Sequence, residues 1–307
     1  MQIVSFRPNG STEPLRAGFS DNGSVIASSD LGYPDTVREL LTHHSHELTT
    51  VLDKARAALA TGESATDLAA VHLGPPVPDP DKILCMGLNY LEHIEEASAA
   101  VTEFPPVFAK FRNSLIGAAD TILMPGISTD IDYEAELAIV IGTRCKNVTV
   151  EDALDHVAGY AVFNDVSARD IQFRSHQWTS GKMLDTFGPM GPGITPKEEI
   201  SDVQALRIQA RVNGVTVQDS NTSKMIWPVA ETISYLSAII TLEPGDIIAT
   251  GTPAGVGLAQ DPPLWLKAND IVEIEIEGLG LLHNTVKAPQ MSGAVKTQAR
   301  KPKIAAA

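Results

Sequence analysis

Acidic side chains alternate in the segment Asp132-Tyr133-Glu134-Ala135-Glu136. On a β-strand, residues two apart point to the same face, so Asp132, Glu134 and Glu136 are expected to project together. Carboxylates on one face repel each other unless a cation lies between them, and oxygen ligands suit Mg²⁺, Mn²⁺ or Ca²⁺. A solvated polar face shows the same spacing, and the alternating glutamates of residues 272–277 are typical of such a face.

The apolar run that follows sets the first segment apart. Leu137–Ile141 is apolar at every position, which is typical of a strand covered on both faces. Glu134 and Glu136 would therefore enter a buried environment, where an unpaired carboxylate costs roughly several kcal/mol. A bound metal ion resolves this cost, and so does an Arg or Lys partner. The spacing by itself leaves both solutions open.

A further aspartate follows the apolar strand Tyr160–Phe163, in Asn164-Asp165-Val166. Asp165 would either cap a helix, with Arg169 as its i, i+4 ion-pair partner, or supply a third oxygen ligand. In the second case, Arg169 and Gln172 on the following helical turns would direct a cation and an amide toward a bound substrate.

Lys182 lies between aromatic residues, in a glycine-containing segment that runs from Trp178 to Phe187. A lysine that is partly desolvated can stabilise an oxyanion, whereas most lysines lie on the surface. Lys110 and Arg112 alternate with Phe108 and Phe111 in the same manner and would close over an anion.

His93 and Glu96 are three residues apart and share one face of a predicted helix. The carboxylate would then orient the imidazole as a general base for water. An ordinary surface His–Glu pair has the same spacing.

Residues 250–257 form a loop, Thr250-Gly251-Thr252-Pro253-Ala254-Gly255-Val256-Gly257, after a short apolar strand. The loop lacks the Gly-Lys-Ser/Thr of a P-loop and the glycine spacing of a dinucleotide-binding turn, so nucleotide binding is not expected. Thr252 and the backbone N–H groups of the loop would instead bind a carboxylate.

The elements that must position these residues divide the chain into four parts. Residues 1–74 are predicted to form a small N-terminal α/β domain, and the proline-rich residues 75–81 a linker. Residues 82–287 form the predicted catalytic domain, and residues 288–307 a flexible basic tail. Within the catalytic domain, Asn213-Gly214 predicts a type I′ hairpin over 207–218, and apolar spacing predicts a helix over 229–240. Short strands with few helices favour an α+β fold over a βαβ array.

Bulk composition excludes several classes of protein. The 307 residues carry a formal net charge of −15, which does not favour binding to nucleic acid or anionic lipid. The two cysteines, Cys85 and Cys145, cannot form a disulfide framework. The sequence has neither a signal-peptide pattern nor an apolar run long enough to cross a bilayer. We therefore expect a cytoplasmic enzyme with no nucleic-acid or membrane partner.

Six segments in this order resemble the fumarylacetoacetate hydrolase superfamily. They are Asp132–Leu137, Asn164–Asp170, Gly181-Lys182 with Asp185, Thr222–Pro228, Leu242–Asp246 and Thr250–Gly257. The resemblance covers roughly residues 82–286. It implies a mixed β-roll/β-sandwich catalytic domain, a small N-terminal α/β domain and a homodimer.

The resemblance also implies roles for individual residues. Glu134, Glu136 and Asp165 match the ligands of Mg²⁺ or Mn²⁺, and Lys182 and Gln172 match residues that contact substrate near the metal. His93 and Glu96 match a dyad that activates water, and Lys110 matches a lysine of the lid, which spans residues 92–104. Met183-Leu184 depart from the serine and aromatic residue that many members carry after Gly-Lys, which blurs inferences about the shape of the pocket.

The predicted reaction is hydrolytic C–C cleavage of an acylpyruvate, such as fumarylpyruvate or maleylpyruvate, in aromatic-compound degradation. The substrate is thus a small 2-oxo acid, and the products are pyruvate and a carboxylic acid. The alternatives are decarboxylation of oxaloacetate, or isomerisation of 2-hydroxyhepta-2,4-diene-1,7-dioate, through the same enolate. An alternative of another class is a metal-stabilised binding protein without catalysis.

Overall fold

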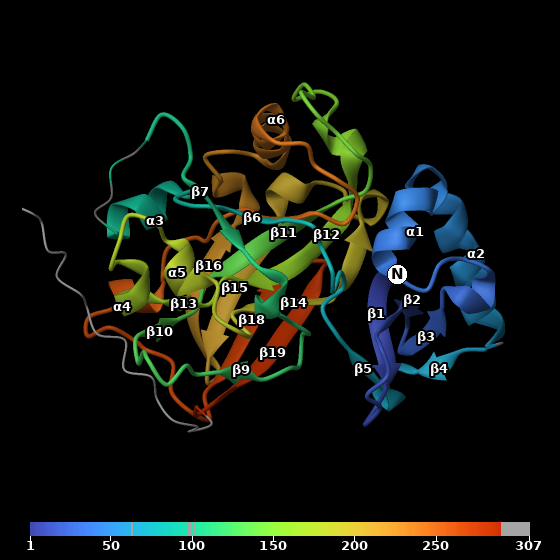
Figure 1. Ribbon diagram of the computed structural model, residues 1–307, viewed down its shortest axis with the longest axis horizontal. Helices are drawn as coiled ribbons and strands as arrows, with labels where there is room; N and C mark the ends of the chain where they lie inside the picture. The colour runs from blue at the N-terminus through green and yellow to red at the C-terminus, as the bar shows by residue number, and fades with distance from the viewer. Residues whose placement is uncertain (63, 98–99, 101, 290–307) are drawn as a thin grey trace, which may run out of the picture.

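The computed structural model describes residues 1–62, 64–97, 100 and 102–289 (Figure 1). The predicted flexible tail, 288–307, falls outside the described residues except for its first two positions. Part of the predicted lid, residues 98–99 and 101, also falls outside them.

Most of the described chain consists of strands and loops. The strands are β1 (Gln2–Pro8), β2 (Arg16–Asp21), β3 (Ser24–Ala27), β4 (Thr66–Asp67), β5 (Val71–Leu73), β6 (Ile83–Met86), β7 (Val107–Lys110), β8 (Leu115–Ile116), β9 (Ile122–Leu123), β10 (Ile131–Asp132), β11 (Ala135–Ile141), β12 (Val157–Asn164), β13 (Ser167–Ala168), β14 (Gly188–Pro196), β15 (Arg207–Val212), β16 (Val215–Asn221), β17 (Ile247–Ala249), β18 (Ile271–Ile276) and β19 (Gly280–Lys287). The α-helices are α1 (Val37–His44), α2 (Leu48–Thr61), α3 (Leu91–Glu96), α4 (Arg169–Gln172), α5 (Thr179–Lys182) and α6 (Val229–Ile239). This balance confirms the predicted α+β class.

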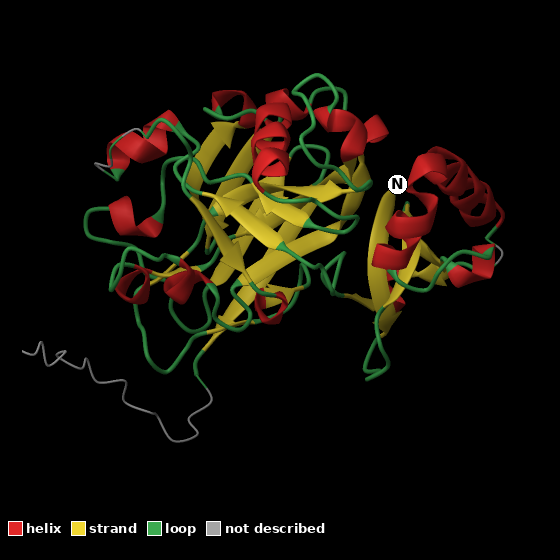
Figure 2. Ribbon diagram, turned by 45° about the horizontal axis from the view of Figure 1, so that its top comes forward, coloured by secondary structure: helices red, strands yellow, loops and turns green. Residues whose placement is uncertain are grey.

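Two large sheets pack against each other, with the helices on their outer sides and at their ends (Figure 2). One sheet has the order β4-β3-β2-β1-β14-β12-β11-β17-β6-β7, and the other has the order β16-β15-β18-β19-β9. A continuous apolar core fills the space between β11 and β12 on one side and β15, β18 and β19 on the other. The fold is therefore a layered β-structure whose central strand is β11.

Strand β11 is buried on both faces, as its apolar sequence predicts. Leu137, Ile139 and Ile141 contribute to the core between the two sheets. Ala138 and Val140 point the other way, into a second core that includes apolar residues of α1 and α2. Glu136 lies on the same face of β11 as Ala138 and Val140. One face of the strand therefore contributes both to this second core and, at its N-terminal end, to the cavity.

The N-terminal unit is joined to the catalytic part by more than the linker. Strand β1 pairs antiparallel with β14, with Ile3 opposite Ile194, so one sheet runs through both parts (Figure 1). Val77 in the proline-rich linker is fully buried, and the Ser5 hydroxyl donates to the Pro76 carbonyl over 2.8 Å. The domain limits stay a prediction, but the linker is packed into the protein and is not a free hinge.

Two local predictions are confirmed by the backbone. β15 and β16 form the predicted hairpin, and Asn213 and Gly214 at its turn have φ values of 52° and 78°. These positive values are those that a type I′ turn requires. The predicted helix at 229–240 is α6. Among the residues that the structure describes, no helix is both long enough and apolar enough to cross a membrane.

Candidate active site

Three carboxylates meet where β11 begins and β12 ends. Glu134, Glu136 and Asp165 each direct an oxygen into a group whose atoms all lie within 4.8 Å of one another. The antiparallel pairing of β11 with β12 brings Ala135 opposite Asn164, and the Asp165 N–H donates to the Glu134 carbonyl over 3.0 Å. Strand pairing therefore places residues that lie about thirty positions apart in one buried cluster, as the sequence predicted for these three residues.

Two lysines lie against this cluster. Lys182, at the end of α5, places its Nζ 2.8 Å from Glu134 Oε2 and 2.8 Å from Asp165 Oδ2. Burial alone would lower the pKa of Lys182, but Asp165 and Glu134 outweigh it and raise that pKa, so the ammonium stays charged. Lys110 Nζ lies 2.6 Å from Asp165 Oδ1. Lys110 is part of β7 in the large sheet and is buried, so its expected place in the lid is corrected.

Arg169 links the cluster to a neighbouring aspartate. Its guanidinium lies 2.7 Å from Asp132 Oδ2 and 2.6 Å from Glu134 Oε1, and it donates to Gln172 Oε1 over 3.0 Å. Helix α4 begins at Arg169 itself, and Ala168 is its N-cap residue. Asp165 is therefore not a helix cap paired with Arg169, and that alternative is excluded.

Asp132 does not join the three carboxylates, although the alternation predicted it. The chain leaves strand geometry at Tyr133 and Glu134, so Asp132 belongs to β10, which pairs with β13 in a separate small ribbon. Its carboxylate accepts from the backbone N–H groups of Gly257 and Leu258 over 2.7 and 3.0 Å. The interruption between β10 and β11 turns this carboxylate toward the loop at 257–258.

Glu136 differs from its two neighbours in lacking a cationic partner. It is 1% exposed, and the Gly251 N–H donates to its Oε2 over 2.9 Å. Among the described residues, Lys110, Lys182 and Arg169 form their ion pairs with Glu134, Asp165 and Asp132. Burial raises the pKa of Glu136 well above its usual range, and Asp165 and Glu134 raise it further. A donor set of three carboxylates with one uncompensated charge fits a divalent ion.

Glu134 shows the opposite electrostatic balance. Burial would raise its pKa, but Lys182 and Arg169 outweigh that effect and lower the pKa to about 2. The cluster therefore combines a carboxylate that stays ionised with one whose charge needs a cation.

The His–Glu pair on α3 has the predicted geometry. His93 Nδ1 lies 2.8 Å from Glu96 Oε1, and the imidazole is partly buried. The second oxygen, Glu96 Oε2, accepts from the Gly255 N–H over 2.9 Å. Both oxygens of Glu96 are thus occupied, which fixes the orientation of the imidazole.

A cavity of about 270 Å³ lies between this pair and the carboxylates. His93, Glu96, Glu134, Glu136, Lys182 and Gln172 provide its polar lining, together with Arg169 and Thr252. Its apolar walls come from Met86, Leu88, Phe108, Phe173, Trp178, Val256 and Leu258. Most of the predicted site residues therefore line one cavity. Asp165 and Lys110 do not line it: Asp165 joins Glu134 and Glu136 in the carboxylate cluster, and Lys110 pairs with Asp165.

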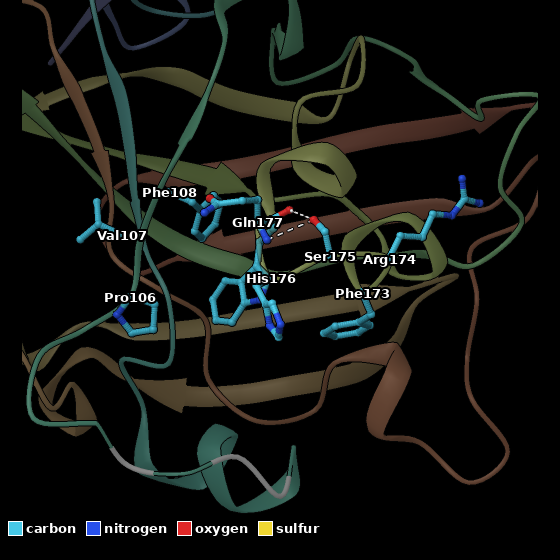
Figure 3. Close-up of a pocket in the computed structure, with 9 residues that line it drawn as sticks. Pro106, Val107, Phe108, Phe173, Arg174, Ser175, His176 and Gln177 are labelled. Carbon is cyan, nitrogen blue, oxygen red and sulfur yellow. Dashed lines mark hydrogen bonds between the residues drawn. The ribbon is translucent and has the colours of Figure 1, made fainter. Parts of the chain in front are cut away.

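A wider groove of about 620 Å³ borders the cavity and shares Phe108, Phe173 and Trp178 with it. In Figure 3, Pro106, Val107 and Phe173 surround this groove, while the Arg174 side chain points away from it. Arg174 instead pairs with Asp170 over 2.9 Å. Arg112, expected beside Lys110 as an anion ligand, is exposed and does not line the cavity.

Two supporting residues escaped the sequence analysis. Gln218 on β16 accepts from the Ala135 N–H over 3.0 Å and donates to Thr252 Oγ1 over 2.8 Å, so it joins β11 to the 250–257 loop. Asn89 donates to the carbonyls of Thr250 and Trp227 and holds the chain just before α3. The sequence carries no signal for Gln218: the alternation of Val215 and Val217 would place it on the outward face, whereas in β16 Gln218 is buried and Val215 is exposed.

Comparison with known proteins gives consistent similarities. The family described as fumarylacetoacetate (FAA) hydrolase C-terminal matches residues 82–287. The chain is 42% identical over 291 residues to oxaloacetate tautomerase fahd2, mitochondrial, of Xenopus laevis, which covers 93% of this chain and 90% of that protein.

Two solved structures extend this similarity to the fold. Fumarylacetoacetate hydrolase from Exiguobacterium antarcticum has a TM-score of 0.81 at 36% identity and covers 94% of this chain and 99% of its own. Maleylpyruvate hydrolase from Sphingobium sp. SYK-6, solved with manganese(II) ion and pyruvate, has a TM-score of 0.77 at 30% identity. It covers 94% of this chain and 100% of its own.

Proposed function

The chain belongs to the fumarylacetoacetate hydrolase family, and we propose that it catalyses keto–enol tautomerisation of a small 2-oxo dicarboxylic acid such as oxaloacetate. The sequence favoured acylpyruvate hydrolysis and kept decarboxylation of oxaloacetate, or isomerisation of 2-hydroxyhepta-2,4-diene-1,7-dioate, as the alternatives with catalysis; tautomerisation was not among them. The relative from Xenopus laevis, similar over nearly its whole length, is an oxaloacetate tautomerase, which supports a reaction of oxaloacetate over hydrolysis.

One observation carries the proposal: a carboxylate-oriented imidazole and a buried ammonium line the same small cavity as Glu134 and Glu136, two of the three clustered carboxylates. Tautomerisation moves one proton between the enol oxygen and the carbon next to the one that bears this oxygen. No single bond between heavy atoms breaks. The reaction therefore needs a group that exchanges a proton and a group that stabilises negative charge on oxygen. It needs no attacking water.

The donor set suits a divalent metal, and the related maleylpyruvate hydrolase was solved with manganese(II). Glu134, Glu136 and Asp165 would hold Mg²⁺ or Mn²⁺, which would supply positive charge beside the oxygens of the 2-oxo acid. Lys110 and Lys182 hold Asp165 in its orientation from two sides.

The protein's own side chains supply the proton transfer. Because Glu96 accepts from Nδ1 of His93, the free Nε2 is the nitrogen that takes or gives the proton at the substrate carbon. Lys182 carries a positive charge into the cavity and stabilises the enol oxygen. The Gln172 carbonyl oxygen is used by Arg169, which leaves the amide N–H₂ to donate to the substrate. Thr252 is proposed to bind a substrate carboxylate.

Hydrolysis of an acylpyruvate is the second candidate. The His93–Glu96 pair can equally take a proton from water, and the fold is similar to that of maleylpyruvate hydrolase. The two candidates share the cluster and differ in whether water attacks a carbonyl carbon.

A panel of substrates tests the proposal. Purified protein is given the enol form of oxaloacetate, acetylpyruvate, fumarylpyruvate and maleylpyruvate, with Mg²⁺, with Mn²⁺ and with EDTA. Loss of enol absorbance faster than in buffer, dependent on metal and without release of pyruvate, is the expected result. Pyruvate released together with a carboxylic acid from an acylpyruvate favours hydrolysis. No turnover of any substrate, with metal bound, contradicts both and favours a binding protein.

A further inference from the structure

Tyr133 lies between Asp132 and the metal-ligand candidate Glu134, yet its side chain leaves the cluster. It is fully buried, and its hydroxyl donates to the carbonyl of Gly255 over 3.0 Å. The proposed reaction gives this tyrosine no part, and Tyr133 does not line the cavity. Its hydrogen-bond partner, Gly255, also forms a hydrogen bond with Glu96 of the His93–Glu96 pair.

Gly255 forms hydrogen bonds with both α3 and the segment just before β11. Its N–H donates to Glu96 Oε2 over 2.9 Å, and its carbonyl accepts from Tyr133 over 3.0 Å. The Gln260 side chain reaches the same carbonyl only at 3.4 Å. The two peptide groups that flank one Cα atom therefore join the Tyr133 hydroxyl to the carboxylate that orients His93.

The backbone at Gly255 is held in a conformation that other residues rarely adopt. Its φ is +103°, and a Cβ atom built there would lie 2.1 Å from the Val217 carbonyl oxygen. Asp132, next to Tyr133, binds the following N–H groups at Gly257 and Leu258. Adjacent residues of the 132–133 segment thus fasten both ends of the short 255–258 loop.

We propose that Tyr133 is a positioning residue: through Gly255 it fixes Glu96, and through Glu96 it fixes the His93 imidazole over the cavity. The inference rests on the proposed role of His93 in proton transfer. It adds that the 132–136 segment, which carries the metal-ligand candidates Glu134 and Glu136, also orients the His93 imidazole. Loss of the Tyr133 hydroxyl leaves the Gly255 peptides free to turn, so the imidazole spends less time in its productive orientation.

A double-mutant cycle tests this role. Kinetics of tautomerisation are measured for wild type, Tyr133→Phe, Glu96→Gln and the double variant. We expect Tyr133→Phe to lower kcat roughly two- to tenfold, the effect of one neutral hydrogen bond, with KM and Mn²⁺ affinity unchanged. In the Glu96→Gln background the same change is expected to have almost no effect, because both act on the same element. Equal effects in the two backgrounds overturn the proposal.

Tyr160→Phe is the matched control, because Tyr160 is equally buried on β12 but does not line the cavity. Hydrogen exchange gives a readout that is independent of activity. If His93→Asn leaves turnover unchanged, the proposed role of His93 fails, and exchange of residues 91–97 and 253–258 then decides the role of Tyr133. Faster exchange of both segments in Tyr133→Phe, and not in Tyr160→Phe, supports positioning, and unchanged exchange rejects it.

Discussion

Nδ1 of His93 lies 2.8 Å from Oε1 of Glu96, one turn further along α3. A carboxylate in this position accepts a hydrogen bond from the Nδ1–H group and leaves Nε2 as the basic nitrogen. The backbone N–H of Gly255 holds the second oxygen of the same carboxylate. The imidazole therefore has a fixed tautomer and a fixed orientation before substrate arrives.

The first prediction concerns this pair. His93→Asn is expected to lower kcat of the proposed tautomerisation by roughly 10²–10⁴-fold, the usual contribution of a general acid–base group. Glu96→Gln keeps the shape but removes the charge, and we expect a smaller loss of about tenfold. Stopped-flow decay of enol oxaloacetate measures both. His44→Asn, which affects a His–Glu pair outside the cavity, serves as the control. Full activity of His93→Asn contradicts the assignment.

The second prediction concerns Glu136, the buried carboxylate that has no Lys or Arg partner among the described residues. With Mn²⁺ at about 100 times its Kd, the wild type is expected to gain about 2.7 kcal/mol in its free energy of unfolding. Glu136→Gln is expected to lose most of this gain, because it removes one charged ligand. Thermal unfolding with and without Mn²⁺ measures the difference.

Glu275→Gln provides the comparison for Glu136→Gln. Glu275 stands in the alternating acidic strand β18, where its side chain is half exposed and pairs with Arg211. The Glu275→Gln variant is expected to keep the full gain in unfolding free energy with Mn²⁺. An equal response in both variants would show that Glu136 is not a ligand.

The third prediction concerns Arg169, which joins Asp132 to Glu134. Arg169→Met leaves the buried Asp132 without its cation and leaves Glu134 paired with Lys182 alone, so the free energy of unfolding is expected to fall by about 3–5 kcal/mol. Arg174→Met removes an exposed ion pair with Asp170 and is expected to cost about 0–1 kcal/mol. Urea denaturation of the two variants, five residues apart, measures the contrast. Equal losses would exclude a supporting role for the buried pair.

Sequence reasoning located the parts of the site that depend on local patterns. Glu134 and Glu136 were recognised because a two-residue alternation runs into Leu137–Ile141, a stretch too apolar for a surface strand. The hairpin at Asn213-Gly214 was recognised because few dipeptides tolerate two positive φ values. The spacing of His93 and Glu96 needed only the helical repeat.

The remaining features depend on long-range pairing, which the local pattern does not contain. The alternation predicted Asp132 as a neighbour of Glu134, but the break before β11 turns it toward Gly257. Lys110 was assigned to the lid, whereas the pairing of β7 with β6 brings it into the sheet behind Asp165. Gln218 reaches the site from the other sheet, and only the packing of the two sheets makes it a neighbour of Thr252.

The last prediction concerns Gly181, which allows α5 to lie directly on α4. A Cβ atom at this position would lie 2.6 Å from the Ala168 carbonyl oxygen and 2.6 Å from Gln172 Cα. Both are backbone atoms, which cannot move aside as a flexible side chain can. Gly181→Ala is therefore expected to lower the free energy of unfolding by about 1–3 kcal/mol, the usual cost of overpacking. Because Lys182 is the next residue, kcat is expected to fall at least tenfold as its ammonium shifts from Glu134 and Asp165.

Gly126→Ala separates this effect from the general cost of adding a methyl group. The nearest atom to a Cβ at Gly126 is 3.9 Å away, which is ordinary contact. This variant is expected to stay within about 0.5 kcal/mol of wild type and to keep its turnover. Denaturant unfolding and the enol assay on both variants decide the matter. If Gly181→Ala behaves like Gly126→Ala, the spacing of α4 and α5 does not set the position of Lys182.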